Sequence, residues 1–314
     1  MTIQAMKFAS RVLFGALAIS LSIRFGVSQV PLRQRKAALK QWYRQDFSLE
    51  NNPDGLAFDG SNIWVTYANC KSVTKIRAID GVKLGSFPVG SAASRVLFDG
   101  ENIWIANGGT NTVTKLRAST GANLGTFRVG STPLGMAFDG ANVWVANRDD
   151  TFVTKIRASD GAVLGNFTVG FYHTSIAFDG ANMWVASIDG TVTELRASDG
   201  ATLGTFPAPA AYEIVFDGVN VWIPGFYGSS VTKIRTSDGA TIGTFPVVGQ
   251  YPYVLTFDGD HIWVGSLDGT INKLAASDGR NLETIPGSWG LEGIMFDGAN
   301  IWTANAGTSV VSKY

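Results

Sequence analysis

The sequence predicts an all-β fold, a seven-bladed β-propeller of four-stranded antiparallel blades. Three observations predict it: a motif that occurs seven times, four strand-like runs in each interval, and two chain ends that complement each other. The first copy of the motif is FDGSNIWV, at 58–65. A period of about 40 residues is typical of repeat architectures. The aspartates of the seven copies are Asp59, Asp99, Asp139, Asp179, Asp217, Asp258 and Asp297.

The third copy shows the repeating unit most clearly. Its apolar runs cover 134–138, 142–147, 152–157 and 163–170, and Asp-Gly pairs follow the first and third runs. The runs are rich in Val, Ile, Phe, Trp and Thr, which favour strands. Asp-Gly pairs suit tight hairpins, because glycine tolerates positive φ. Four short antiparallel strands per repeat indicate a propeller blade.

The two ends of the chain each supply part of one blade. The last repeat ends at Tyr314 after its third strand, and Phe47 lies eleven residues before Phe58, just as Phe87 lies eleven before Phe98. We therefore expect one N-terminal strand to pair with three C-terminal strands and close the ring. Deleting residues 29–50 is expected to open the ring and destabilise it strongly.

The N-terminus differs from the repeats. Basic residues precede the apolar segment 12–23, and small residues follow it at 26–28. This layout predicts a signal peptide over 1–28, a basic linker over 29–45 and a propeller over 46–314. The protein is then exported to the periplasm or the extracellular space. An uncleaved N-terminal anchor is the alternative, because Arg24 lies close to the expected cleavage position.

Charge separates these regions. Residues 1–45 hold eight Lys or Arg and no acidic residue, so the propeller retains 17 basic against 25 acidic side chains. A net charge of about −8 on the propeller argues against nucleic acid as a partner. After cleavage no membrane span is expected, and the protein is expected to be a monomer.

Several conspicuous residues are explained by the repeat. A tryptophan five residues after each aspartate is expected to pack between neighbouring sheets, and each Asp-Gly-x-Asn turn is expected to satisfy its own hairpin rather than bind calcium. The third-strand Lys and Arg residues are expected to be outer-strand charges that contribute little stability. The tryptophans are Trp64, Trp104, Trp144, Trp184, Trp222, Trp263 and Trp302, and the charged pairs are Lys75/Arg77, Lys115/Arg117, Lys155/Arg157 and Lys233/Arg235.

The second strands, with WVAN at 144–147, WIAN at 104–107 and WTAN at 302–305, resemble the Tyr-Val-Thr-Asn repeats of bacterial propellers. The unit is also similar to NHL-like repeats and to those of the streptogramin (virginiamycin B) lyase superfamily. That resemblance covers 47–314 and implies a propeller. It also implies an alternative activity, a Mg²⁺-dependent lyase or lactone-opening reaction that uses a His and a Glu.

Function is expected where the repeat breaks. Connections that lead into first strands, or leave second strands, emerge on one face, where propeller pockets usually form. Aromatic side chains with a few charges around a concavity are typical of a site for a sugar, a peptide or a flat organic ligand. The expected ligand-binding residues are Arg95, Arg148, Asp149, Tyr172, Tyr212, Tyr227, Tyr251, Tyr253, Trp289 and Glu292.

The residues leave binding and catalysis open. The preferred hypothesis is an exported propeller that binds a small molecule, a glycan or a protein without chemistry of its own, and it requires no cofactor. In the enzymatic alternative, His173 is the general base and Glu213 lies on the next loop, so the two could pair. Mg²⁺ or Ca²⁺ enters only in that alternative, where Glu213 or Glu292 would help to hold the metal. A purely structural or surface-interaction role is a third hypothesis.

Overall fold

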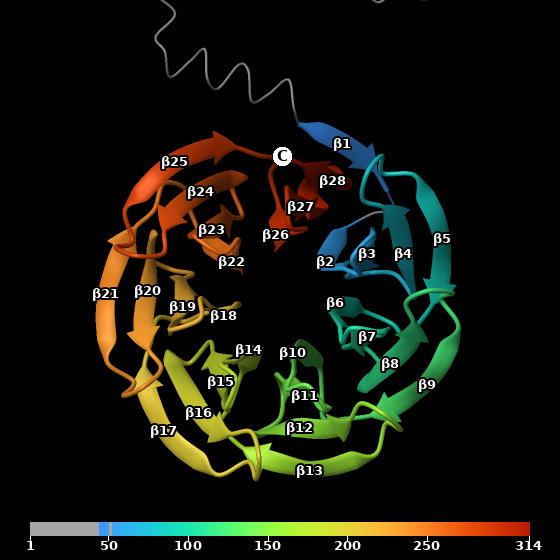
Figure 1. The fold of residues 1–314 in the computed structure, drawn as a ribbon, viewed down its shortest axis with the longest axis horizontal. Coiled ribbons are helices and arrows are strands. Elements are labelled where there is room, and N and C mark those ends of the chain that lie inside the picture. Colours follow the sequence, from blue (N-terminus) through green and yellow to red (C-terminus); the bar gives the residue numbers. More distant parts are fainter. Residues whose placement is uncertain (1–43, 50–51) are drawn as a thin grey trace, which may run out of the picture. The chain divides into compact units, whose positions relative to one another are not determined.

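The protein is an all-β propeller. The computed structural model describes residues 44–49 and 52–314, so the expected signal peptide and almost all of the basic linker lie outside the described residues. Within the described propeller, four-stranded antiparallel sheets surround a central axis, each with its first strand innermost (Figure 1). No helix of the described chain has the length and apolarity needed to cross a bilayer.

Hydrogen bonding divides the described strands into five separate four-stranded sheets and one eight-stranded sheet. The four-stranded sheets consist of β10 (Pro133–Phe138), β11 (Asn142–Asn147), β12 (Phe152–Arg157) and β13 (Val163–Thr168); β14 (His173–Phe178), β15 (Asn182–Ser187), β16 (Thr191–Arg196) and β17 (Thr202–Pro207); β18 (Val215–Phe216), β19 (Asn220–Gly225), β20 (Ser230–Arg235) and β21 (Thr241–Pro246); β22 (Pro252–Phe257), β23 (His261–Ser266), β24 (Thr270–Ala275) and β25 (Asn281–Pro286); and β1 (Gln45–Ser48), β28 (Val310–Lys313), β27 (Ile301–Asn305) and β26 (Leu291–Phe296), with the 3₁₀ helix η1 (Ala306–Thr308) between β27 and β28.

The eight-stranded sheet corrects the prediction of seven separate blades. It consists of β2 (Pro53–Phe58), β3 (Asn62–Tyr67), β4 (Ser72–Arg77), β5 (Lys83–Pro88), β6 (Ala93–Phe98), β7 (Asn102–Asn107), β8 (Thr112–Arg117) and β9 (Asn123–Arg128). The pair Tyr67–Ala93 joins β3 to β6, and so unites two sets of four strands that the sequence predicted to be separate.

One sheet contains strands from both ends of the described chain, as the sequence predicted. β1 pairs antiparallel with β28, and Phe47 lies opposite Val311. The Phe47 ring stacks on Trp302, with ring centroids 5.6 Å apart. It also covers Gly81 of the next sheet, where φ is +70° and a Cβ atom would lie 2.0 Å from the ring. Phe87 packs on Gly121 in the same way, so Phe47 takes the fourth-strand position of this sheet.

The repeated aspartate and tryptophan hold the first hairpin of each sheet. Asp59 Oδ1 accepts bonds from the backbone N–H groups of Ser61 and Asn62, and Oδ2 accepts from Trp64 Nε1 at 2.9 Å. All seven repeat tryptophans donate in this way, at 2.7–2.9 Å. Burial alone would raise the pKa of Asp59, but the bonds from Trp64 and Asn62 outweigh it and lower that pKa. The prediction that these residues are structural is confirmed.

The expectation that the third-strand lysines are outer-strand charges was wrong. Lys155 is 7% exposed, and its Nζ donates to the Ala197 carbonyl of the next sheet at 2.7 Å while lying 4.8 Å from the Trp144 ring centroid. Arg157, two residues further along, would share the face of Lys155 in an unbroken strand. The pairing of β12 with β13 shifts register between Lys155 and Ile156, and Arg157 is exposed and pairs with Asp160. The equivalent lysine-to-carbonyl bonds are Lys75 to Ala118, Lys115 to Ala158, Lys233 to Ala276 and Lys313 to Ala78.

We name this arrangement the lysine clamp: a third-strand ammonium between an indole ring, the Asp of the same sheet and a carbonyl of the next. A cation over an aromatic face is attracted by the ring quadrupole. Desolvation makes a buried ammonium unfavourable unless it is paired, and the carbonyl and carboxylate supply that pairing. The clamp therefore connects neighbouring sheets at the five contacts where this bond is formed.

The Phe47 contact gives a stability prediction. Phe47→Ala is expected to lower the free energy of unfolding by about 2–3 kcal/mol, somewhat less than for a fully buried phenylalanine. Urea unfolding of both proteins measures it. Ser48→Ala, on an exposed neighbour in β1, is the control and should change stability by less than about 0.5 kcal/mol. Equal stability of Phe47→Ala and the wild type would contradict a sealing role for β1.

Candidate functional site

The first strands bring one group of polar side chains to the centre of the ring. β2, β6, β10, β14, β22 and β26 each have a register shift near their start. Such bulges re-aim side chains and are frequent beside functional sites. The residues three or four positions before the repeat phenylalanine form what we call the channel cluster: Asp54, Arg95, Ser175, Glu213, Tyr253 and Glu292.

A buried ion pair lies in the channel cluster. Arg95 Nη1 donates to Asp54 Oδ1, and Asp54 is 7% exposed. The same guanidinium nitrogen lies 3.4 Å from the Glu292 carbonyl oxygen, and Arg95 Cζ lies 5.9 Å from the Tyr253 ring centroid. Arg95 thus connects three first strands that are distant in sequence.

Burial sets the protonation behaviour of the cluster. It raises the pKa of Asp54 to about 7, because desolvation outweighs the opposing effect of Arg95. It raises the pKa of the Tyr253 phenol to about 12 and that of the Glu292 carboxyl above its usual value. Desolvation would lower the pKa of Arg95, but the Asp54 carboxylate raises it on balance, so Arg95 stays charged.

A second polar contact completes the cluster. Ser175 Oγ donates to Glu213 Oε1 at 2.5 Å, and the backbone N–H of Ile214 donates to the same oxygen at 3.3 Å. Glu213 therefore bonds to the neighbouring first strand, at Ser175. The sequence allowed Glu213 to pair with His173, but the partner of Glu213 in that strand is Ser175.

The cavity at the cluster is small. It has a volume of about 120 Å³ and is lined by first-strand residues that include Arg95, Ser175, Glu213 and Glu292. At about 30 Å³ per water, it holds roughly four water molecules. Ligand pockets usually measure about 300–1,000 Å³. A drug-sized ligand would therefore lie above the channel, on the loops, with the cluster as its floor.

Five aromatic side chains border the floor on one side. The Tyr212 ring lies 4.8 Å from Phe226 and 4.9 Å from Tyr253, and Phe226 lies 5.0 Å from Tyr227 and 5.4 Å from Tyr251. Tyr227 and Tyr251 are 75% and 47% exposed. We call these five residues the aromatic cluster. It joins the channel cluster through Tyr253.

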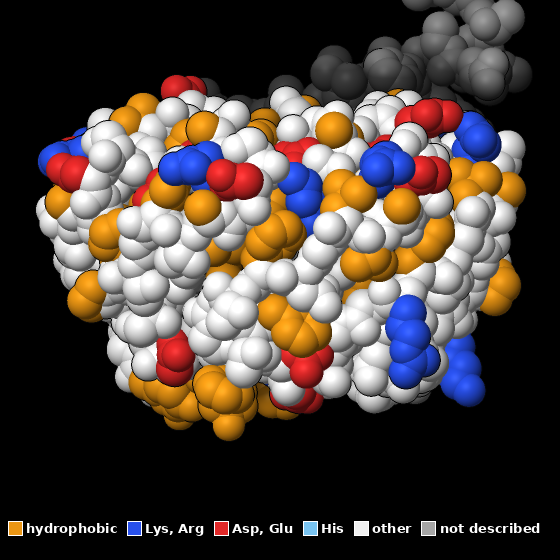
Figure 2. Space-filling model, turned by 90° about the horizontal axis from the view of Figure 1, so that it is seen from below, with side chains coloured by type: hydrophobic (Ala, Val, Ile, Leu, Met, Phe, Trp, Pro, Cys, Tyr) orange, Lys and Arg blue, Asp and Glu red, His pale blue; other side chains and the backbone are white. Residues whose placement is uncertain are grey.

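The aromatic cluster belongs to the face opposite the Asp-Gly turns. Phe226 and Tyr227 follow a second strand, Tyr212 and Tyr251 precede first strands, and Tyr253 lies near the start of β22. Basic and acidic side chains alternate near one rim of the propeller, and a group of hydrophobic side chains protrudes at the opposite rim (Figure 2).

Arg148 and Asp149 form an exposed pair on the same kind of loop. Arg148 Nε and Nη2 donate to the two Asp149 carboxylate oxygens at 2.9 and 3.2 Å. This pairing raises the pKa of Arg148, and the phenols of Tyr212 and Tyr253 act on it in the same direction. The Arg148–Asp149 pair thus lies within electrostatic reach of the aromatic cluster.

Two expected ligand-binding residues lie apart from this group. Trp289 is 67% exposed and packs against the backbone of Gly307, and the Tyr172 ring lies tilted beside Phe171, with ring centroids 6.2 Å apart. No ring contact joins either residue to the aromatic cluster within residues 52–314. Both are exposed aromatic residues on the loops, but they do not extend the same surface.

His173 is fully buried at the start of β14. Its Nδ1 lies 3.4 Å from Ser187 Oγ, Nε2 has no hydrogen-bond partner, and burial lowers its pKa. His173 is not among the residues that line the channel cavity, and the part of the chain that is described has no hydrogen bond or ion pair between His173 and Glu213. The structure does not bring the two expected catalytic residues together.

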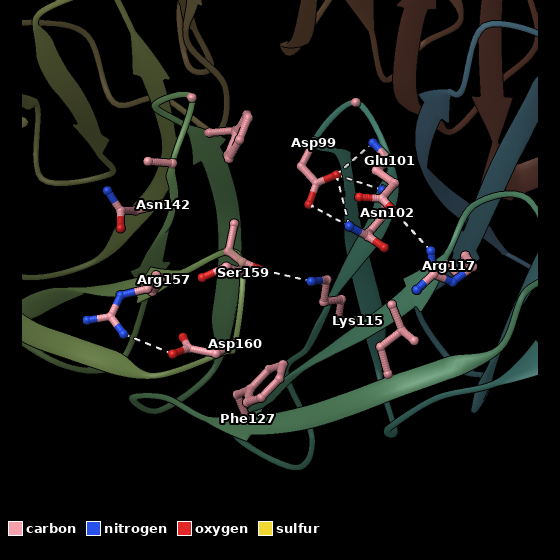
Figure 3. Close-up of a pocket in the computed structure, with 16 residues that line it drawn as sticks. Asp99, Glu101, Asn102, Lys115, Arg117, Phe127, Asn142, Arg157, Ser159 and Asp160 are labelled. Atoms are coloured by element: carbon pink, nitrogen blue, oxygen red, sulfur yellow. Dashed lines mark hydrogen bonds and ion pairs between the residues drawn. The ribbon is translucent and has the colours of Figure 1, made fainter.

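A larger groove lies on the other face, between the β6–β9 strands and the β10–β13 sheet (Figure 3). Its volume is about 890 Å³, but its basic side chains are already paired. Lys115 donates to the Ala158 carbonyl, Arg117 pairs with Glu101, and Arg157 pairs with Asp160. Size alone therefore does not make this groove the candidate site.

The described residues also limit metal binding. Between residues 44 and 314, apart from Glu50 and Asn51, no group of three or more His, Cys, Asp or Glu side chains is arranged to hold a metal ion. The Arg95 guanidinium lies among the channel carboxylates and would repel a cation. The channel cluster as it stands does not fit a divalent metal.

Sequence reasoning missed Asp54, Ser175 and Phe226. Asp54 lies four residues before Phe58, as Glu292 lies four before Phe296. Comparing that one position across all repeats would have found Asp54, because the other strands carry Tyr, Glu, Ser, Thr or Leu there. Ser175 could not be distinguished from an ordinary strand residue until Glu213 was seen to bond with it.

The comparisons with known proteins support the fold. The streptogramin B lyase structure matches with a TM-score of 0.75 and 17% identity, over 86% of this chain and 96% of that chain. Virginiamycin B lyase from Staphylococcus aureus matches with a TM-score of 0.73 and 18% identity, over 86% and 98%. Hydrazine synthase from Kuenenia stuttgartiensis matches with a TM-score of 0.74 and 15% identity, over 85% and 97%.

The expected resemblance to streptogramin lyases is therefore confirmed at the level of the fold. No protein-family model matches the chain, and no curated protein matches it. At identities of 15–18%, these matches show a shared propeller fold. A shared fold does not imply a shared activity.

The buried ion pair gives a pH-dependent prediction. Arg95→Met leaves the Asp54 carboxylate buried without its counter-charge, which should cost about 3–5 kcal/mol of stability at pH 8. The loss should be smaller at pH 5. A carboxyl with a raised pKa contributes stability below its unfolded pKa, and that stability is lost as pH rises through the folded pKa of about 7.

Urea unfolding at the two pH values measures this effect. The double variant Asp54→Asn/Arg95→Met is the control, because it removes both charges and should recover much of the stability at pH 8. An equal loss at pH 5 and pH 8 in Arg95→Met would contradict the assignment.

Proposed function

We propose that this protein is an exported β-propeller that binds an organic ligand at the aromatic cluster, above the channel cluster. The ligand is a small molecule, a glycan or a peptide segment of a protein. The observation that carries the proposal is the contiguous contact of five aromatic rings beside a buried Arg–Asp pair. Aromatic rings supply a large contact area, and the phenols supply hydrogen bonds.

Backbone conformation at Tyr251 supports the proposal. Its φ is +58°, which is unfavourable for a bulky residue, and its carbonyl accepts from Leu267 N–H at 3.1 Å. The equivalent residues Ala92 and Thr132 share positive φ, so the repeat imposes this conformation. A tyrosine at such a position is more easily explained by use of its exposed ring than by stability.

The ring architecture belongs to the same proposal. We infer that β2–β5 and β6–β9 act as two blades despite the Tyr67–Ala93 pair, so the protein works as a closed seven-bladed ring. Contacts of β2 with β26, and the bond from Lys313 to the Ala78 carbonyl, support closure. Closure would hold the first strands rigid, and with them the residues of the floor.

A metal-dependent lyase is the second candidate, favoured by the shared fold alone, because the Arg95 guanidinium beside the channel carboxylates opposes a cation there. The burial of His173 weighs against it. Turnover of quinupristin in the presence of Mg²⁺ tests it, since quinupristin is named with a virginiamycin B lyase structure. Turnover that Glu213→Gln abolishes would establish an enzyme. No turnover at high protein concentration would leave binding as the function.

Binding is tested directly by isothermal titration calorimetry. The titrants are quinupristin, aryl glycosides and short aromatic peptides. For any titrant that binds, Tyr227→Ala/Tyr251→Ala is expected to weaken affinity at least tenfold, which corresponds to about 1.4 kcal/mol. Phe171→Ala removes an exposed ring outside the aromatic cluster and is the control, with unchanged affinity. If the control and the double variant lose affinity equally, the aromatic cluster is not the site.

A further inference from the structure

One contact between sheets has no lysine at the clamp position. In β16 the clamp position holds Glu194, which is only 8% exposed. The six other repeats have lysine at this position: Lys75, Lys115, Lys155, Lys233, Lys273 and Lys313. The exception lies between the β14–β17 sheet and the β18–β21 sheet, and we call this contact the Glu194 joint.

A carboxylate reverses every attraction of the clamp. In the neighbouring contact, Lys155 approaches the Asp139 carboxylate, the Trp144 ring and the Ala197 carbonyl. The counterpart of Ala197 in the next sheet is Thr236, at the same distance along the chain from Glu194. Carboxylate, indole face and carbonyl oxygen are all electron-rich, so an ionised Glu194 is not attracted to any of the three groups that bind the lysine ammonium.

The surrounding hydrogen bonds have adjusted to Glu194. Asn182 Nδ2 donates to Glu194 Oε1 at 2.8 Å, whereas Asn142 Nδ2 donates to the Asp139 carboxylate at 3.0 and 3.1 Å. Asp179 keeps its bond from Trp184 Nε1 at 2.8 Å. Glu194 and Asp179 are therefore two neighbouring acidic side chains, whereas the other contacts have one aspartate and one lysine at these positions.

No cation of the described chain neutralises this pair. The arginines of the two third strands, Arg196 and Arg235, are exposed and pair with Asp199 and Asp238 at 2.9 and 2.8 Å. Burial raises the pKa of Glu194, and the charge of Asp179 raises it further. Protonation is thus the way in which Glu194 can become a donor in this contact.

The β18–β21 sheet is also the least regular. β18 has two residues, whereas the other six first strands have six each. The irregular segment before β18 carries Tyr212 and Glu213, and β19 leads into Phe226 and Tyr227. The sheet beside the Glu194 joint therefore supplies much of the aromatic cluster and has the weakest inner pairing.

We infer that the Glu194 joint is a proton-dependent contact that controls how tightly the β18–β21 sheet is held. With its proton, the Glu194 carboxyl donates a hydrogen bond across the joint toward the Thr236 carbonyl, in place of the lysine ammonium. When the proton leaves to solvent, the donor is lost, two carboxylates face each other, and the β18–β21 sheet loosens.

The direction with pH follows from linkage. A carboxyl with a raised folded-state pKa contributes stability that is complete below its unfolded pKa and is lost as pH rises through the folded pKa. The joint is therefore tight in acid and looser toward neutral and alkaline pH. This inference concerns the scaffold, so it does not depend on the proposed ligand.

Hydrogen–deuterium exchange of the full chain at pD 5 and pD 8, corrected for intrinsic rates, tests the joint. In the wild type, amides of β15, β16, β19 and β20 are expected to exchange at least tenfold faster at pD 8, while β11 and β12 change little. Glu194→Gln and Glu194→Lys both supply a donor without titration, and each should abolish the difference. Lys155→Glu should create the same pH dependence at the neighbouring contact.

Two exchange results would overturn the inference. Unchanged pH-dependent exchange in Glu194→Gln, which is close to isosteric, would overturn it. So would equal protection of all contacts in the wild type at pD 8. If Lys155→Glu does not fold, the two Glu194 variants still give the answer.

Discussion

Packing between the sheets of this propeller depends on a third-strand ammonium, which six of the seven repeats supply. A lysine from the third strand lies over the tryptophan of its own sheet and donates to a carbonyl of the next, at 2.6–2.9 Å in five contacts. A buried charge is tolerated only when its donors are satisfied. The Asp-Gly turn, the indole and the neighbouring carbonyl can satisfy the lysine only if adjacent sheets keep a fixed orientation. The repeat motif therefore packs neighbouring sheets together as well as forming the hairpins.

The floor of the candidate site depends on that orientation. Arg95, Asp54 and Glu292 come from three different first strands, and their contacts exist only while neighbouring sheets hold their relative positions. The channel itself is too small for most ligands. The fold thus presents a rigid polar floor and places the adaptable aromatic rings in loops above it, where variation does not disturb the clamp.

Periodicity predicted much of this from the sequence. The interval of about 40 residues indicated four strands per repeat, the packed tryptophans and the strand from 45–48 that completes the last sheet, and the structure has them. Counting strands could not reveal the single Tyr67–Ala93 pair that unites two sets. The burial of Lys155 was missed because a charged residue on a strand is usually exposed, and only the carbonyl of the next sheet explains it.

The candidate site was predicted in part. Tyr212, Tyr227, Tyr251 and Tyr253 do meet, as the irregular loops suggested, whereas Tyr172 and Trp289 lie apart from them. The expected partnership of His173 with Glu213 was wrong in its geometry, since sequence adjacency of loops does not specify which way a side chain turns. His173 is buried beside Ser187 on the adjacent strand of its own sheet, while Glu213 bonds to Ser175.

The most direct test of the lysine clamp is hydrogen exchange of the indole N–H groups of the repeat tryptophans, resolved by NMR at neutral pH. Each indole donates to an aspartate beneath the clamp, so its exchange reports opening of that contact. We expect Trp64, Trp104, Trp144, Trp222 and Trp302 to exchange slowly and at similar rates, and Trp184, which has Glu194 in place of lysine, to exchange fastest. Protection of Trp184 equal to that of the other five would contradict the account.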